Sequence, residues 1–325
     1  MTSYPILWDS GVYLPDLELW LDPRRPRRRA VISHAHDDHV AAHPLAYATP
    51  ATCRLVNHRR PTLTTVQPLD YGETLTLERC SVSFYPAGHV LGSAQTLIES
   101  DAGRILYTGD LKTRRGFTSG SATPVKADVL VLESTFGKPH YRFPDASEVI
   151  ANVVRWCSQV IDGGATPVLL GYSLGKGQEI LSALAAEGLA IALHRSLFGV
   201  TDVYRELGCS FPDYQLLDGV VGGPTVAIIP PTARRDGLRD WLGEFQTASL
   251  TGWAMDASLK ERLDVDATFP LSDHADFEEL CCYAEAVGAE LTYTVLGFDE
   301  ELAMHLRRRG LRAKALASVD QLRLF

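Results

Sequence analysis

Long apolar runs are absent from the 325-residue chain, and none approaches the roughly 18–20 residues that a membrane-spanning helix needs. The N-terminus, MTSYPILWDSG, lacks a basic region followed by an apolar one, so we expect no signal peptide and a cytoplasmic protein without membrane contact. None of the six cysteines forms a C-x-x-C pair. This argues against a structural zinc site or a disulfide framework and favours reduced thiols.

Positive charge is also scarce. The chain has 31 Lys and Arg against 40 Asp and Glu, which gives a net charge of −9. This balance excludes a protein that coats nucleic acid through a basic surface, but it allows an enzyme that holds a phosphodiester locally. Arginines cluster at residues 24–29, 114–115 and 234–235, and each cluster is interpreted as a solvated face.

Internal repeats and low-complexity tracts are absent too, and 46% hydrophobic with 22% charged residues is typical of a globular protein. Up to Ser134 the chain reads as short strands: LELWLD, RAVIS, SVSFYPAG, AQTLIES, GRILYTGD and ADVLVLES. Many of these runs end in or lead to a polar residue: Asp22, His34, His89, Asp110 and Glu133. Side chains at strand ends converge along one edge of a sheet, where distant positions can meet.

Beyond Phe143 the pattern changes to strands that alternate with helices, which predicts a parallel sheet with crossover helices. Asp145 is expected to cap a helix over 146–162 that stops at two glycines. The last segment, from LSDHAD onward, returns to the first style. We therefore predict an α/β protein in which residues 144–268 form a domain inserted into another, built from residues 1–143 and 269–325.

The segment SHAHDDHV carries most of the chemistry. His34 and His36 lie two residues apart at a strand end, so their side chains project to the same side, and Asp38 and His39 follow as the chain turns into a helix. Imidazole and carboxylate suit zinc or a similar divalent cation. The alternative is a histidine-rich surface turn, which the improbable H-x-H-x-D-H spacing disfavours.

Two later residues strengthen the metal hypothesis. His89 lies between glycines in PAGHVLG, where the backbone can turn closely around a site, and Asp110 ends the run LYTGD, where its carboxylate could bridge two cations. Each alone would be an ordinary turn residue or helix cap.

In order and spacing, these segments resemble the metallo-β-lactamase fold. The further pieces LES at Glu133, GKGQE at 175–179 and SDHAD at His274 resemble its β-CASP branch of nucleases. Within that branch, YTGDLKTRRG and the short C-terminus are most similar to bacterial ligase-associated DNA exonucleases. The resemblance implies an αββα sandwich that carries an inserted α/β β-CASP domain.

The resemblance also implies a role for each matching residue. A first zinc ion would be bound by His34, His36 and His89. A second would be bound by Asp38 and His39, with Asp110 between the two ions and Asp22 orienting ligands. Glu133 would steer His274, which would donate a proton to the departing sugar oxygen. Asp38 and Asp110 would serve the reaction through the metals.

One position departs from the family pattern. RNA-cutting members carry a further ligand histidine where this chain has Leu296, and DNA-processing members carry an apolar residue there. Leu296 therefore favours DNA and leaves the second zinc weakly held, or exchangeable with manganese or magnesium. The expected function is a DNA exonuclease that acts on single strands or ends in repair, alongside a ligase and a helicase. The alternatives are a ribonuclease that processes RNA 3′ ends, a hydrolase of thioesters or lactams, and a non-catalytic nucleic-acid-binding scaffold.

The turn SLGKGQE opens a helix, whose N-terminal amides attract phosphate. Ser173, Lys176 and Gln178 are candidates for phosphate or nucleic-acid contacts. The turn lacks the P-loop pattern, so nucleotide hydrolysis is not expected there. An ordinary strand-to-helix connection is the alternative.

Overall fold

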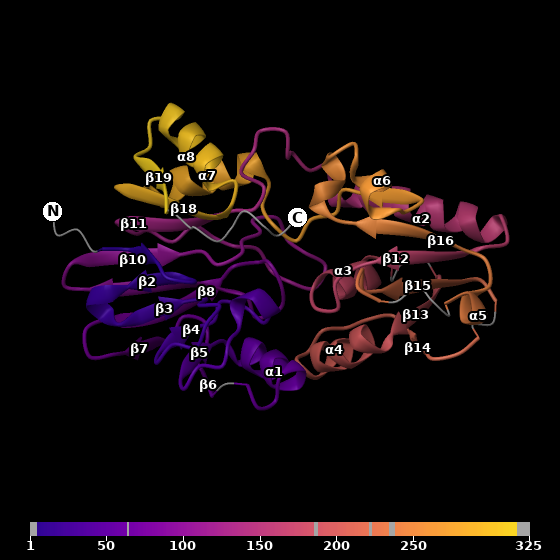
Figure 1. Cartoon of the computed structure of the whole chain (residues 1–325), viewed down its shortest axis with the longest axis horizontal. Coiled ribbons are helices and arrows are strands. Elements are labelled where there is room, and N and C mark those ends of the chain that lie inside the picture. Colours follow the sequence, from indigo (N-terminus) through magenta and orange to yellow (C-terminus); the bar gives the residue numbers. More distant parts are fainter. Residues whose placement is uncertain (1–4, 64, 185–187, 221–222, 234–237, 317–325) are drawn as a thin grey trace. The chain divides into compact units, whose positions relative to one another are not determined.

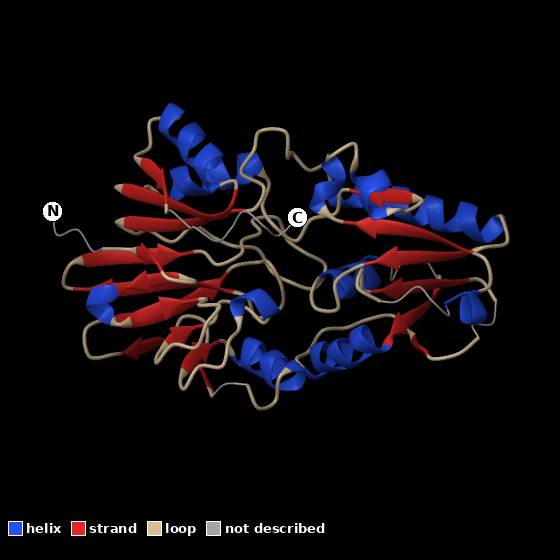
Figure 2. Ribbon diagram, in the orientation of Figure 1, coloured by secondary structure: helices blue, strands red, loops and turns tan. Residues whose placement is uncertain are grey.

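The computed structural model describes residues 5–63, 65–184, 188–220, 223–233 and 238–316 (Figures 1 and 2). The chain has a mixed α/β fold with three sheets. It divides into two compact units: Met1–Arg142 with His274–Phe325, and Phe143–Asp273. No helix in the described ranges is long and apolar enough to cross a membrane.

The first unit holds a six-stranded sheet. Its strands are, in spatial order, β1 (Leu7–Trp8), β2 (Val12–Leu14), β3 (Leu19–Leu21), β4 (Ala30–Val31), β5 (Ala46–Ala48) and β6 (Val66–Pro68). Strand β2 pairs antiparallel with β1 and with β3, whereas β3, β4, β5 and β6 run parallel to one another. A 3-10 turn, η1 (Pro15–Leu17), joins β2 to β3. Helix α1 (Pro50–Arg59) packs Cys53 against Ala30 and Ile32 at this sheet.

The second sheet of this unit has seven strands. They are β19 (Ala313–Ala315), β18 (Leu291–Gly297), β11 (Val129–Ser134), β10 (Gly103–Tyr107), β9 (Ala94–Ser100), β8 (Ser81–Pro86) and β7 (Thr74–Thr76). Strands β7 to β10 are antiparallel neighbours, whereas β10, β11, β18 and β19 run parallel.

The core of the first unit explains why two sheets form. Leu19 and Val31 of the first sheet share one buried cluster with Phe84 and Ile98 of the second, so the sheets pack face to face. A second cluster buries Leu132 against the helices α7 (Phe277–Val287) and α8 (Asp299–Arg308). The strands of the second sheet that face both layers are therefore mostly apolar on both sides, with buried polar exceptions such as Thr96 and Thr294.

The second unit is a parallel six-stranded sheet with helices. Its strands are, in spatial order, β14 (Gln215–Leu217), β13 (Ala190–His194), β15 (Thr225–Ile229), β12 (Thr166–Leu170), β16 (Phe245–Leu250) and β17 (Ala267–Phe269). Its helical elements are α2 (Ala146–Asp162), α3 (Lys176–Ala183), α4 (Arg195–Glu206), α5 (Leu238–Leu242), η4 (Gly252–Met255) and α6 (Leu259–Leu263).

Helix α2 shows how local sequence sets an element. The Asp145 side chain accepts a hydrogen bond from the Ser147 amide at the predicted N-cap, and Gly163 follows the last turn. Its buried residues Val149, Val153, Cys157 and Val160 recur at helical spacing. The expected bounds of this helix are confirmed.

The second compact unit continues past β17 to Asp273. Leu271 is buried in the same cluster as Val149 and Leu169, so residues just after β17 belong to the second unit.

Candidate metal centre

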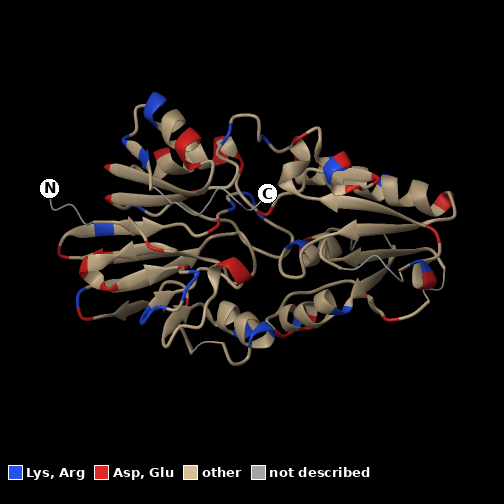
Figure 3. Cartoon of the chain, in the orientation of Figure 1, with Lys and Arg blue, Asp and Glu red and all other residues tan. Residues whose placement is uncertain are grey.

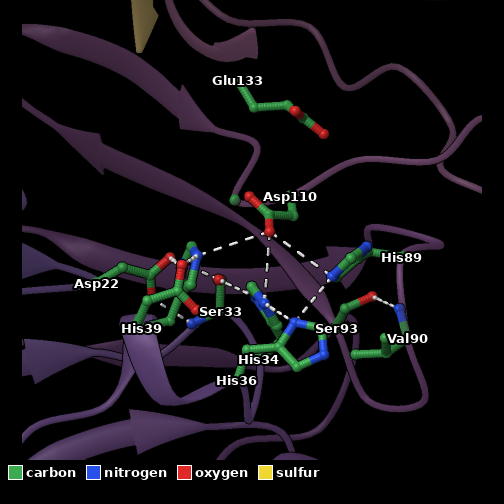
Figure 4. A network of polar contacts seen from close by, with 12 residues as sticks. Asp22, Ser33, His34, His36, His39, His89, Val90, Ser93, Asp110 and Glu133 are labelled. Atoms are coloured by element: carbon green, nitrogen blue, oxygen red, sulfur yellow. Dashed lines mark hydrogen bonds and ion pairs between the residues drawn. The ribbon is translucent and has the colours of Figure 1, made fainter. Parts of the chain in front are cut away.

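Separate loops of the first unit bring the predicted ligands together (Figure 4). His34 follows β4, and His36 precedes a short 3-10 helix, η2 (Asp37–His39). His89 lies in the loop between β8 and β9, and Asp110 follows β10. Gly109 takes φ +55 beside Ser33, where an added Cβ would lie 2.7 Å from the Ser33 Cβ, so glycine allows the two loops to approach.

The first ligand group is tightly spaced. His36 Nδ1 lies 2.9 Å from His34 Nε2 and 3.2 Å from His89 Nε2. Asp110 Oδ2 lies 3.5 Å from His34 Nε2 and 3.6 Å from His89 Nε2. Zinc–nitrogen bonds near 2.0–2.1 Å place tetrahedral ligand atoms roughly 3.3 Å apart. The four side chains therefore have the spacing and the donor chemistry to hold a divalent metal ion.

A second group shares Asp110. His39 Nε2 lies 3.6 Å from Asp110 Oδ2 and 3.6 Å from Asp38 Oδ2. One oxygen of Asp110 therefore faces both groups, as a bridging ligand requires. This second group offers fewer donors than the first, and the Asp38 side chain is half exposed.

Asp22 orients the second group from behind. Its carboxylate accepts hydrogen bonds from the Ser33 amide at 2.7 Å, from the Tyr107 hydroxyl at 2.8 Å, and from His39 Nδ1 at 2.8 Å. Because a carboxylate can only accept, His39 carries its proton on Nδ1 and presents the Nε2 lone pair to a cation. Asp22 itself takes φ +48, an uncommon left-handed conformation for a residue other than glycine.

Burial and neighbouring charges shift the pKa values of several side chains in the two ligand groups. Burial and the neighbouring histidines hold the pKa of His34 well below its usual value, so this ligand is neutral. Burial opposes charge on His39 as well, but Asp110, Asp38 and Asp22 raise the pKa of His39 to about 10. Burial raises the pKa of Asp110 to about 7. A divalent cation bound by these side chains would supply positive charge that balances the negative charge of the carboxylates.

Glu133 and His274 form a pair beside the ligands. Glu133 is fully buried near the end of β11, and its Oε1 lies 3.0 Å from His274 Nδ1. Burial raises the pKa of Glu133, but His274 and the amides of Thr135 and Leu111 outweigh it and lower the net value. The His274 ring centroid lies 4.5 Å from that of His89. The pair therefore combines an ionised carboxylate with a histidine at the ligand cluster.

The position of Leu296 is also clear. Leu296 lies at φ +61 near the end of β18 and packs against the core between the two sheets. Its apolar side chain offers no ligand atom. His305 does not substitute for it, because the His305 ring packs edge-on against Phe277, with centroids 5.1 Å apart.

Sequence reasoning missed three supporting residues. Ser33 donates its hydroxyl to Asp22 and contacts His34 Nδ1 at 2.9 Å, and Tyr107 reaches the same aspartate. Arg59 of α1 donates to the Ala35 carbonyl at 2.6 Å and to Asp37 at 2.7 Å, so it ties down the ligand loop. Ser33 and Tyr107 flank the ligand motifs, but nothing in the local sequence signals the Arg59 contact.

Lys176 and Gln178, the candidates for phosphate contacts, have partners within the second unit. Lys176 is 3% exposed, and its ammonium donates to the Leu271 carbonyl at 2.7 Å and pairs with Asp273 at 3.2 Å. Gln178 is fully buried. Its Oε1 accepts a hydrogen bond from the Gly175 amide, and its Nε2 donates one to the Thr201 hydroxyl. Both side chains thus stabilise the turn of the second unit itself. Ser173 is partly exposed and contacts the Ser196 hydroxyl at 2.7 Å, so its phosphate contact stays a prediction.

Replacing Lys176 tests whether this residue stabilises the turn or contacts phosphate. We expect Lys176→Ala to lower the free energy of unfolding by about 3 kcal/mol, because it leaves Asp273 without its buried partner. Urea unfolding measures this loss, with Ser173→Ala as the control whose surface hydroxyl contributes little. A stable Lys176→Ala protein with weaker, more salt-sensitive nucleic-acid binding would restore the phosphate interpretation.

The arginine clusters are largely engaged by acidic partners. Arg27 pairs with Asp9 at 2.6 Å, and Arg114 pairs with Glu279 at 2.8 Å. Residues 234–235 lie outside the described part of the chain. Figure 3 shows acidic and basic residues interspersed over the chain. The interpretation as a solvated face fits exposed Arg28, whereas Arg114 is only partly exposed and pairs with Asp276 and Glu279.

Comparison with known proteins gives several relatives, although no family model matches. A protein of Opitutus terrae named "Probable DNA ligase" is 39% identical over 99% of this chain. RNase aCSPSF2 of Saccharolobus solfataricus is 30% identical over 48% of the chain, and the 5′ exonuclease Apollo of Gallus gallus is 34% identical over 55%. The chain covers 32%, 37% and 41% of these relatives' own lengths.

A solved structure supports the fold. It is described as a protein of unknown function from Enterococcus faecalis V583, and it matches 84% of this chain and 76% of its own with a TM-score of 0.59 and 14% identity. At that identity the likeness concerns the fold alone. The ligand motifs and the relatives named as nucleases make this chain similar to the β-CASP branch of the metallo-β-lactamase family.

Proposed function

We propose that this chain is a metal-dependent phosphodiester hydrolase that degrades DNA from its ends. The observation that carries the proposal is the position of one atom, Asp110 Oδ2, within 3.5–3.6 Å of ring nitrogens of His34, His39 and His89. We further propose that the first unit is the αββα sandwich of the family and that the second unit is its inserted β-CASP domain.

Zinc fits the donor set, since imidazole nitrogens and carboxylate oxygens are its usual ligands. His34, His36, His89 and Asp110 would hold the first ion, and Asp38, His39 and Asp110 the second. The second ion has no ligand at the position of Leu296, so it would exchange with manganese or magnesium. When bound, such cations supply Lewis-acid stabilisation of the charge that develops on phosphate oxygens and make water more acidic.

The residues of the chain would divide the remaining work. Asp22 holds His39 in the tautomer that presents Nε2. Glu133 accepts a hydrogen bond from His274 Nδ1, which leaves His274 Nε2 to carry the proton for the departing sugar oxygen. Hydrolysis by this arrangement needs no covalent enzyme intermediate.

Two features favour DNA as the substrate. Leu296 replaces the histidine of RNA-cutting members, and the relative matched along nearly the whole chain is named a probable DNA ligase. That name also supports a functional association with a ligase. The alternative is a ribonuclease, which the likeness to RNase aCSPSF2 over about half of the chain supports.

End-labelled DNA and RNA strands of one sequence test the proposal, with 5′-phosphate or 5′-hydroxyl ends and with added zinc, manganese or magnesium. We expect progressive shortening of DNA that stops with a chelator and resumes when metal is returned. Degradation of RNA alone would favour the ribonuclease. Binding without any cleavage would favour a non-catalytic scaffold.

A further inference from the structure

The segment Asp110 to Arg114, here called the strap, connects a metal-ligand position to the helix that follows His274. Arg114 lies four residues after Asp110. Its guanidinium donates to Glu279 Oε1 from Nε at 2.8 Å and to Asp276 Oδ2 from Nη2 at 2.9 Å. Thr113 donates its hydroxyl to the same Glu279 oxygen at 2.7 Å. The planar fork of arginine suits such a two-carboxylate contact.

The two carboxylates that Arg114 binds are the capping box of α7. Asp276 Oδ1 accepts the Glu279 amide at 2.9 Å, and Glu279 Oε2 accepts the Asp276 amide at 2.8 Å. His274 lies two residues before this cap. Arg114 therefore fixes the direction in which the chain leaves His274 and enters the helix.

Leu111 holds His274 from its other side. The Leu111 amide donates to Glu133 Oε1 at 2.7 Å, which is the oxygen that contacts His274 Nδ1. The Leu111 carbonyl accepts the Ala275 amide at 2.5 Å. The strap thus contacts the carboxylate partner of His274, the peptide after it, and the helix cap beyond.

We propose that Arg114 is a positioning residue that sets the distance and direction from His274 to Asp110. The inference rests on the proposed function, in which His274 protonates the leaving oxygen. Arg114 is 40% exposed at its side chain, and such ion pairs contribute little to stability. Helix α7 is anchored independently by Phe277 and Leu280 in the buried core. The main effect of Arg114 is then on the alignment of His274, where a shift near 1 Å costs on the order of 10²-fold in rate.

The test compares Arg114→Gln with Arg309→Gln. Arg309 also pairs with α7, donating to Glu278 at 2.8 Å from the end of α8. Its partners among the described residues, Glu278, Glu285 and Phe277, lie outside the strap. Each variant is assayed on a DNA strand and on the same strand with sulfur in place of the leaving oxygen at the cleaved bond. A thiolate leaves without protonation, because thiol pKa values lie near 8.5.

For Arg114→Gln we expect kcat on ordinary DNA to fall about 10–100-fold, with KM and bound zinc unchanged. On the sulfur-containing strand the variant should match the wild type within about 2-fold, since the proton of His274 is no longer needed. On ordinary DNA, the kcat of Arg114→Lys should lie between those of Arg114→Gln and the wild type. Arg309→Gln should resemble the wild type on both strands. Glu279→Gln removes the same contact from the other side and should not add to Arg114→Gln.

Three results would overturn the inference: equal loss on both strands, loss of zinc from Arg114→Gln, or an equal defect in Arg309→Gln. Each would make Arg114 a general structural residue. A wild-type protein that cuts neither strand would instead overturn the proposed function, on which the inference rests. A variant that does not fold would contradict the small stability contribution argued above.

Discussion

Asp110→Asn should lower nuclease activity by on the order of 10⁴-fold or more while the protein remains folded. Asp110 Oδ2 is the atom shared by both ligand groups, so the substitution removes the negative charge that two cations would share. The amide also places a donor where a ligand oxygen stood. The loss should therefore exceed that of any ligand that serves one group alone.

Three measurements check this expectation: degradation of end-labelled DNA, metal content after dialysis, and circular dichroism. Asp101→Asn is the control, because Asp101 is an exposed aspartate in the turn between β9 and β10. Full activity with full metal content in Asp110→Asn would remove Asp110 from the centre.

His274→Ala should lower turnover about 10²–10⁴-fold with metal content unchanged, which is the usual scale for a positioned general acid. The Glu133 contact at 3.0 Å occupies His274 Nδ1 and leaves Nε2 to carry the proton in the proposed reaction. Steady-state kinetics and metal analysis of the same preparation check both parts. His305→Ala is the matched control, since His305 packs beside α7 away from the ligand groups.

Loss of bound metal from His274→Ala would reassign this residue. Asp110, Glu133 and His274 can also place one ligand atom each within 4.8 Å of one another, so a ligand role has a geometric basis. Metal analysis separates that role from proton donation.

Much of the centre could be predicted from sequence because its ligands are chemically distinctive. His34, His36, Asp38 and His39 fall in one short segment, and their spacing alone predicts a metal site. His89 lies between two strands, and Asp110 follows a third, that the apolar or alternating pattern predicts. Helix α2 was equally accessible, because its cap, apolar spacing and terminal glycines agree.

Long-range contacts could not be predicted. Lys176 after a glycine suggested phosphate binding, yet its partner Leu271 is far along the chain, and burial of an ammonium leaves no local trace. Arg114 resembled a solvated arginine for the same reason. Strands of two or three residues, such as β1 and β4, are too short for the periodicity of two to be distinctive.

The most direct test of the central claim is anomalous X-ray diffraction at the zinc edge from crystals of protein purified with zinc. We predict a strong peak within coordination distance of His34, His36, His89 and Asp110, and a weaker one beside Asp38 and His39. Crystals grown with excess zinc that show no peak among these residues would contradict the metal centre and the nuclease function built on it.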